Sequence, residues 1–193
     1  NIGSNFNSVA VGQLNMNNVY GNCTVSFKEI EELNISDVYP MHNNLIGRWD
    51  IGNSYLDGHI RKANIDQGGK LPFSIYFNQY VDVVNIRNMS HIAEKVQSGD
   101  TFFWFEEGVG EVNIDNLQLG SSMFRVWTPS PVVVNITNSS FMLSDSANPS
   151  ADNVFNLVNC DVCMATGTDK RKHDLTFRGT MSQLREYLEK YGY

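Results

Sequence analysis

The chain has 193 residues, a formal net charge of −7 and only 18% charged residues, whereas asparagine fills 23 positions. This length suits one domain with a sizeable core. The acidic balance and the lack of a basic cluster argue against nucleic acid and against a membrane as partners. We find no apolar run that could span a membrane and no signal peptide, and since the chain does not begin with Met, we expect it to continue upstream.

One short pattern recurs along the whole chain: apolar, Asn or Asp, apolar, any residue, then Asn, Asp, Gln or Gly. Successive copies begin 14 to 28 residues apart. The copies start at Leu14, Leu33, Trp49, Ala63, Val84, Val112, Val134 and Phe155, with a weaker ninth at Leu175. Recurrence at a spacing near 20 residues indicates a solenoid, in which each repeat is one coil.

Each copy has the properties of a short strand followed by a sharp turn. The first and third positions are apolar and the second and fourth mostly polar, so one face should be buried. The fifth position carries residues that tolerate left-handed backbone angles, and the sixth is often apolar again, so it should re-enter the core. In stacked coils the second-position residues would lie about 4.8 Å apart and form a ladder of hydrogen-bonded amides.

The alternative of a leucine-rich repeat fits less well, because the Asn in IEELNISDV falls one position too early and the intervening segments are rich in β-formers. The repeat and its Asn turn resemble the right-handed parallel β-helix of the pectate-lyase-like superfamily over roughly residues 10–179. Irregular coil lengths and an Asn-rich, Lys-poor composition are most similar to a phage tailspike or appendage protein. The predicted fold is all-β: a right-handed parallel β-helix solenoid of about nine coils over residues 1–179, followed by a capping α-helix over residues 180–193.

The fourth positions of three consecutive copies place Asp66, Arg87 and Asp115 in one exposed column. The two carboxylates would be roughly 9–10 Å apart, which is near the upper limit for the acid and base of an inverting glycosidase. Arg87, also a candidate ligand-binding residue, would lower the pKa of both carboxyl groups, which is the wrong direction for a general acid. The alternative is an ion-pair ladder on the surface.

A second set of candidate catalytic acids lies near aromatic segments. Asp82 follows SIYFNQYV, and Glu106 and Glu107 follow TFFWF. Adjacent glutamates on a strand point to opposite faces, so Glu106 and Glu107 should not serve one site. The segment Asp57–Arg61 combines an acid, an imidazole and a cation, and we expect it to be a solvated loop.

Several aromatic residues are candidate sugar-stacking platforms, because flat apolar rings fit the faces of pyranoses. Trp104, Trp127 and Tyr80 are the main ones, and Tyr76 and Trp49 are others. Alternate aromatics of TFFWF must belong to the core, and the pattern places Trp49 inward as well.

No cofactor and no metal are expected. The Cys160-x-x-Cys163 pair is half a zinc site without a second pair, so we interpret both residues as core thiols and Cys23 as too distant to join them. Neither the paired-Asp motif of polygalacturonases nor the Asp-rich calcium site of pectate lyases is evident.

The last segment, TMSQLREYLEKYGY, predicts one amphipathic helix. Its N-cap is either Thr180 or Ser182, and Gly192 is the expected C-cap. The apolar face comprises Leu184, Tyr187, Leu188 and Tyr191. Such a helix would either cover the open end of the solenoid or mediate oligomerisation.

The resemblance implies a structural, receptor-binding fragment of a phage tail or head appendage that recognises bacterial surface polysaccharide. It also implies a homotrimer assembled in the host cytoplasm and carried in the virion. Two alternatives stay open: a polysaccharide depolymerase on the same scaffold, and a secreted bacterial β-helix adhesin, which would need an upstream signal peptide.

Overall fold

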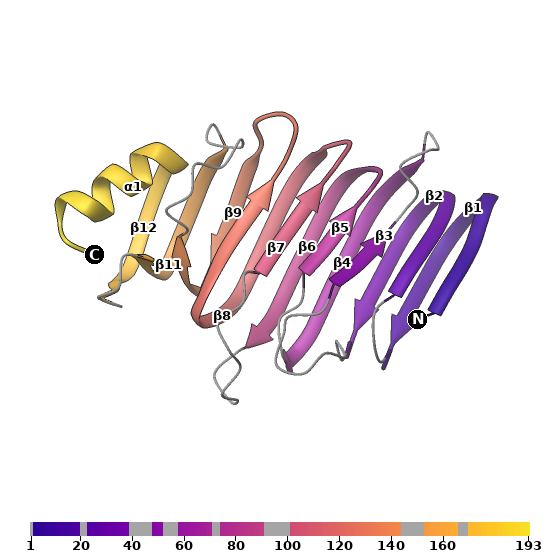
Figure 1. The fold of residues 1–193 in the computed structure, drawn as a ribbon, viewed down its shortest axis with the longest axis horizontal. Helices are drawn as coiled ribbons and strands as arrows, with labels where there is room; N and C mark the ends of the chain where they lie inside the picture. Colours follow the sequence, from indigo (N-terminus) through magenta and orange to yellow (C-terminus); the bar gives the residue numbers. More distant parts are fainter. Residues whose placement is uncertain are drawn as a thin grey trace.

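The computed structural model describes residues 2–19, 23–38, 48–51, 58–70, 74–90, 101–143, 153–165 and 170–193. In these ranges the protein is almost entirely β-structure with one helix at its C-terminal end (Figure 1). The elements are β1 (Ile2–Asn17), β2 (Cys23–Ser36), β3 (Arg48–Ile51), β4 (His59–Lys70), β5 (Ser74–Phe77), β6 (Tyr80–Ser90), β7 (Thr101–Phe105), β8 (Val109–Trp127), β9 (Val133–Thr137), β10 (Ser140–Leu143), β11 (Val154–Met164), β12 (Lys172–Thr180) and α1 (Met181–Lys190). The predicted all-β class with a terminal α-helix is confirmed.

The strands lie side by side along the long axis of the molecule, from β1 at one end to β12 and α1 at the other (Figure 1). Among the described residues every strand pairing is parallel except that of β11 with β12. Long strands pair twice: β8 joins β6 along residues 109–118 and joins β7 along residues 124–127. Through these double pairings β8, β9, β11 and β10 close a hydrogen-bonded ring of four parallel strands.

Seven copies of the repeat lie in one register across the strands β1, β2, β4, β6, β8, β9 and β11. Their first residues are Leu14, Leu33, Ala63, Val84, Val112, Val134 and Phe155. Because the copies are in register, the positions that the period-two alternation predicts to be buried lie on the same face of each of these strands.

The two other predicted copies do not belong to this series. A second row of paired strands runs from residues 23–25 of β2 through β3, β5 and β7 to residues 124–127 of β8. Trp49 lies on β3 in this second row, where it pairs with Cys23 and Ile75. Leu175 lies on β12, which runs antiparallel to β11, opposite Cys160. Among the described residues the aligned series thus has seven copies and not nine, because any half-buried strand with a polar residue between two apolar ones can match so short a pattern. The side chain of Trp49 lies outside the described residues.

The core follows the predicted alternation. First and third positions such as Leu33, Ile35, Val84 and Ile86 are buried. The sixth position re-enters the core as expected, at Val38, Met89, Leu117 and Cys160. In the second row the alternate aromatics of β7 are buried, and the ring of Phe105 stacks on that of Phe77 with centroids 5.2 Å apart. Burial of these side chains on both rows supplies the main driving force for folding.

The turn after each copy uses the left-handed region of the backbone. The fifth residues with φ between 51° and 60° are Asn18, Asp37, Asn88, Asn116, Asn138 and Asn159. Asn and Asp adopt this conformation more readily than other non-glycine residues. The Ala63 copy differs, because its left-handed residues are Gly68 and Gly69 and its fifth residue, Gln67, is fully buried. The Gln67 amide there accepts from the Val38 N–H at 2.9 Å and donates to the Val38 carbonyl at 3.0 Å.

Helix α1 ends the fold at the side opposite β1 (Figure 1). Its N-cap is Thr180, whose hydroxyl accepts from the Gln183 N–H while the Gln183 side chain accepts from the Thr180 N–H. Met181, Leu184 and Leu188 are buried, and the helix contacts β11 and β12. Tyr191 is the C-cap, and the expected glycine, Gly192, follows it in the left-handed conformation with a φ of 67° and ends the helix. One expectation needs correction: the Tyr191 side chain, placed on the apolar face, is 53% exposed.

Candidate functional site

The second positions of the aligned copies form the predicted amide ladder. Each asparagine after the first donates its Nδ2 to the Oδ1 of the asparagine in the preceding copy, with distances of 2.8 to 3.1 Å. The members are Asn15, Asn34, Asn64, Asn85, Asn113, Asn135 and Asn156. Asp50, which the sequence placed in this column, instead pairs with Tyr76 in the second row. Because the amides bond to one another, we interpret the ladder as structural.

The column of Asp66, Arg87 and Asp115 exists as predicted, on the adjacent strands β4, β6 and β8. Arg87 Nε lies 3.9 Å from Asp66 Oδ2, and both side chains are about half exposed. Asp115 Oδ1 accepts hydrogen bonds from Thr137 Oγ1 at 2.7 Å and from Asn138 Nδ2 at 2.9 Å. Arg87, Asp115 and Thr137 line a shallow hollow of about 220 Å³.

Hydrogen bonding disfavours an acid role for Asp115. Its pKa is lowered from the ordinary value, first by the Thr137 hydroxyl, then by the Asn138 amide and, as a smaller effect, by the charge of Arg87, while burial acts in the opposite direction. A carboxyl group with a lowered pKa stays ionised and cannot protonate a leaving group at neutral pH. The geometry of this column favours the ion-pair ladder over the glycosidase pair.

Two of the other predicted residues, Tyr80 and Glu107, lie together where the two rows of strands meet. A larger hollow of about 500 Å³ opens there, which we call the corner hollow. Its lining comprises Tyr80, Glu107, Gly108, Val109, Gly110, Glu111, Pro129, Ser130, Pro131, Val132 and Val133. Tyr80 and Val133 are each 39% exposed, so the walls offer a ring and an aliphatic side chain to solvent.

Two glycines shape the corner hollow. The chain turns after β7, with the Gly108 N–H donating to the Phe105 carbonyl at 3.2 Å, and Gly108 has a φ of 105° that suits glycine. A Cβ at Gly110 would lie 2.6 Å from the backbone oxygen of Asp82, too close for any other residue. The glycines therefore let the start of β8 approach β6 closely enough to bring Glu107 beside Tyr80.

Glu106 and Glu107 belong to this turn and not to a strand, because β7 ends at Phe105. Both side chains are exposed. Glu106 Oε2 accepts a hydrogen bond of 2.5 Å from Trp104 Nε1, whereas Glu107 lines the corner hollow.

His59 and Asp82 form a pair that the sequence did not reveal. His59 Nε2 lies 2.8 Å from Asp82 Oδ1, and the imidazole centroid lies 6.0 Å from that of Tyr80. His59 begins β4 and pairs with Tyr80 of β6, so the expected solvated loop is wrong for residues 59–61. The residue five positions before the ladder asparagine is His59 in one copy and Tyr80 in the next. Counting back from the repeat would have found this neighbourhood.

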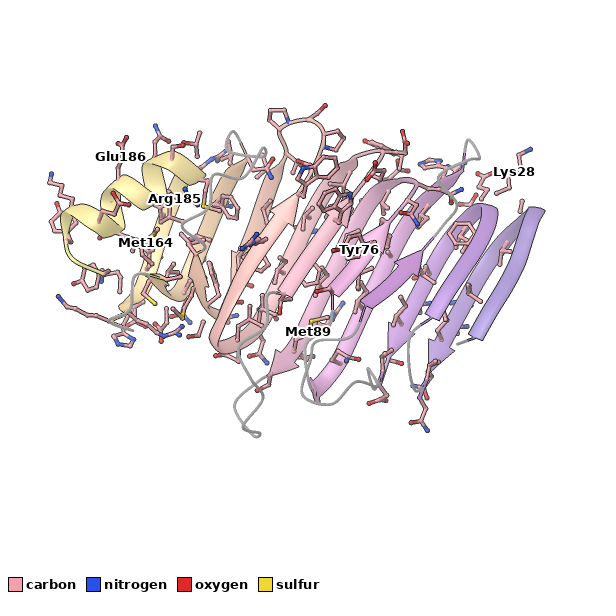
Figure 2. All side chains as sticks on the ribbon, viewed as in Figure 1. Lys28, Tyr76, Met89, Met164, Arg185 and Glu186 are labelled. Atoms are coloured by element: carbon pink, nitrogen blue, oxygen red, sulfur yellow. The ribbon has the colours of Figure 1, made fainter. Side chains whose placement is uncertain are left out.

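The predicted aromatic residues stack along the second row of strands. The centroid of the Trp104 ring lies 5.7 Å from that of Tyr76, with an angle of 18° between the ring planes. It lies 4.2 Å from the centroid of the Trp127 ring, with an angle of 14° between the planes. Figure 2 shows Tyr76 in the middle of the molecule over β5. Because neighbours cover both faces of the Trp104 ring, it offers its edge rather than a face to a sugar, and Tyr80 is the better platform.

Two thiols among the described residues are confined to the core. Cys160 and Cys163 are buried free thiols, as predicted, and burial raises the pKa of Cys160. In the described part of the chain, no three His, Cys, Asp or Glu side chains come together as metal ligands. None of the described residues forms a helix with the length and apolar character needed to cross a membrane.

The corner hollow thus unites Tyr80 and Glu107, with Asp82 and His59 beside it, while Asp66, Arg87 and Asp115 form a separate group. Trp104, Trp127 and Glu106 belong to the stacked aromatic row next to the same turn.

Comparisons of the chain with protein-family models, with curated proteins and with solved structures found no match.

Proposed function

We propose that the chain is a right-handed parallel β-helix from a phage tail or head appendage, and that it binds bacterial surface polysaccharide in the corner hollow. The parallel register of seven copies and the doubly paired long strands support a scaffold of stacked coils. The closed ring of β8, β9, β11 and β10 is what such stacking produces, because one long strand takes part in both rows. The phage origin, the virion location and the homotrimer come from the resemblance of the repeat and composition.

The observation that carries the binding site is the exposed ring of Tyr80 in a hollow of about 500 Å³. Ligand sites commonly occupy about 300–1,000 Å³ and combine apolar walls with a few polar groups. An aromatic ring can lie against the apolar face of a pyranose, while carboxylates such as Glu107 and Glu111 accept hydrogen bonds from sugar hydroxyls. The corner hollow offers both kinds of contact within one sugar-sized space.

Retention on immobilised bacterial capsular and wall polysaccharides tests this proposal. We expect Tyr80→Ala to weaken binding of the retained glycan by about fivefold, since loss of one stacking contact is worth on the order of 1 kcal/mol. Tyr191→Ala is the matched control, because Tyr191 is also exposed but lies at the end of α1. Equal binding by the Tyr80→Ala variant and the wild type would contradict the proposed site.

Cleavage of the bound glycan is a second candidate function, and one observation favours it. The imidazole of His59 is bonded to Asp82 beside Tyr80, and an imidazole held by a carboxylate can act as a general base. On this hypothesis the wild type shortens a retained polysaccharide, as size-exclusion chromatography would show, and His59→Asn retains the glycan without shortening it. Retention without any shortening by the wild type would leave a binding protein.

A further inference from the structure

The charges in the corner hollow have a single sign. Among the described residues that line it, the charged side chains are Glu107 and Glu111, and both are exposed. Lys, Arg and His do not occur in that lining. A ligand in this space therefore faces two carboxylates.

Within the described part of the chain, neither carboxylate forms an ion pair with a basic side chain. The ion pairs of the described residues join other acids to His59, Arg61, Lys62, Arg87 and His173. Glu111 Oε1 accepts a hydrogen bond of 2.9 Å from Asn113 Nδ2, which is an uncharged donor. The imidazole of His59, whose centroid lies 6.0 Å from that of Tyr80, is already paired with Asp82. The negative charge of the hollow is thus left for a ligand to balance.

The apolar part of the lining restricts the shape of such a ligand. The Tyr80 ring is joined by Pro129, Pro131 and the exposed Val133. A small flexible cation would leave these surfaces without a partner. A pyranose that carries an ammonium group would use both parts, with its apolar face on Tyr80 and its charge toward the glutamates.

We propose that the corner hollow selects glycans that contain amino sugars with a free ammonium group and disfavours glycans that carry uronate or other anionic groups. This inference rests on the proposed glycan binding, because it names the sugar that the same hollow takes. Opposite charges attract a glucosamine unit, whereas two carboxylates repel an acidic unit in the same place.

Calorimetric titration with three oligosaccharides at mildly acidic pH tests this selectivity: a β-1,4-glucosamine hexasaccharide, its fully N-acetylated form, and a galacturonate hexasaccharide. We expect the glucosamine oligomer to bind most tightly and the galacturonate most weakly. The double variant Glu107→Gln/Glu111→Gln should bind the glucosamine oligomer roughly three- to tenfold less tightly, since exposed ion pairs are individually weak. Its affinity for the N-acetylated oligomer should stay within twofold of the wild type.

The control is Glu186→Gln/Glu189→Gln on α1, which changes the net charge equally at two exposed positions far from the hollow. If this control weakens glucosamine binding as much as the hollow variant does, the attraction belongs to the overall charge and the inference is wrong. Preference for galacturonate would also overturn it but leave glycan binding intact. Binding of no bacterial polysaccharide and of none of the three oligosaccharides would overturn the proposed function itself.

Discussion

At the scale of single residues, each inner member of the amide ladder holds three strands together. Asn85 donates to Asn64 and accepts from Asn113 through its side chain, and it is partly buried. Asn15, at the end of the ladder, is exposed and makes one such bond. A side-chain amide that bridges two neighbours should therefore contribute more to stability than one at the end.

We predict that Asn85→Ala lowers the free energy of unfolding by about 1–3 kcal/mol, because it removes two hydrogen bonds and leaves ladder neighbours without a partner. Asn15→Ala should lower it by less than about 1 kcal/mol. Urea unfolding with an unchanged m-value would measure both. Equal effects of the two substitutions would show that the ladder does not stabilise the stack.

Asp115 gives a pH dependence whose sign follows from its lowered pKa. The folded state holds the charged form more tightly than the unfolded state does, so the stabilisation is complete above the unfolded pKa. It is lost as the pH falls through the lower folded pKa. We predict that Asp115→Asn destabilises the protein at neutral pH and that the difference from the wild type disappears in strong acid. Thermal unfolding across this range measures it, and a constant difference would contradict the account.

Thr137→Val should raise the pKa of Asp115 toward its ordinary value, because the Thr137 hydroxyl is the largest cause of the lowering. Carbon-13 NMR titration of the Asp115 carboxyl group would detect the shift. An unchanged pKa in this variant would assign the effect to Asn138 and Arg87 instead.

Some features of single residues could be predicted from the sequence and others could not. The left-handed turn residues and the ladder could be predicted, because both depend on backbone preferences and on a local repeat. The buried Gln67 amide could not, since its partner Val38 lies on another strand. The His59–Asp82 pair also joins two strands, and finding it requires counting back from the aligned asparagines.

At the scale of elements, the C-terminal helix begins at a single well-defined residue. The sequence offered Thr180 and Ser182 as N-caps, and the structure assigns the capping box to Thr180 and Gln183. We predict that Thr180→Ala lowers stability by about 1 kcal/mol, whereas Ser182→Ala, at an exposed helical position, changes it by less than about 0.5 kcal/mol. Thermal unfolding of both variants would measure this, and the reverse order would place the cap at Ser182.

The strands show why two repeat copies were misassigned. Trp49 and Leu175 satisfy the same apolar–polar–apolar pattern as the true copies, yet one lies in the second row and the other in an antiparallel strand. Alternation reports that a strand has one buried face, and it does not report which neighbour the strand pairs with. Row membership depends on contacts between distant parts of the chain.

At the scale of the whole molecule, the two ends of the stack differ. Among the described residues strand β1 pairs with β2 alone, whereas β6 lies between β4 and β8, and β12 and α1 lie at the other end (Figure 1). We predict that amide hydrogen exchange, followed by mass spectrometry, is fastest in β1 and slowest in β4, β6 and β8. Opening a terminal strand breaks one interface, whereas opening a central strand breaks two. Equal protection of β1 and β6 would contradict a linear stack.

The candidate site was only partly visible in the sequence. Tyr80, Asp82 and Glu107 were selected because acids lay near aromatic residues, and the structure gathers these three around one hollow or beside it. The contribution of Gly108 and Gly110 depends on the close approach of two strands, which no local pattern reveals.

The most direct measurement is a crystal structure of the protein with the polysaccharide fragment that it retains most tightly. The account predicts stacked parallel coils with a sugar ring against Tyr80 and within hydrogen-bonding reach of Glu107 or Glu111. A sugar bound instead over Arg87 and Asp115, with the corner hollow empty, would contradict it.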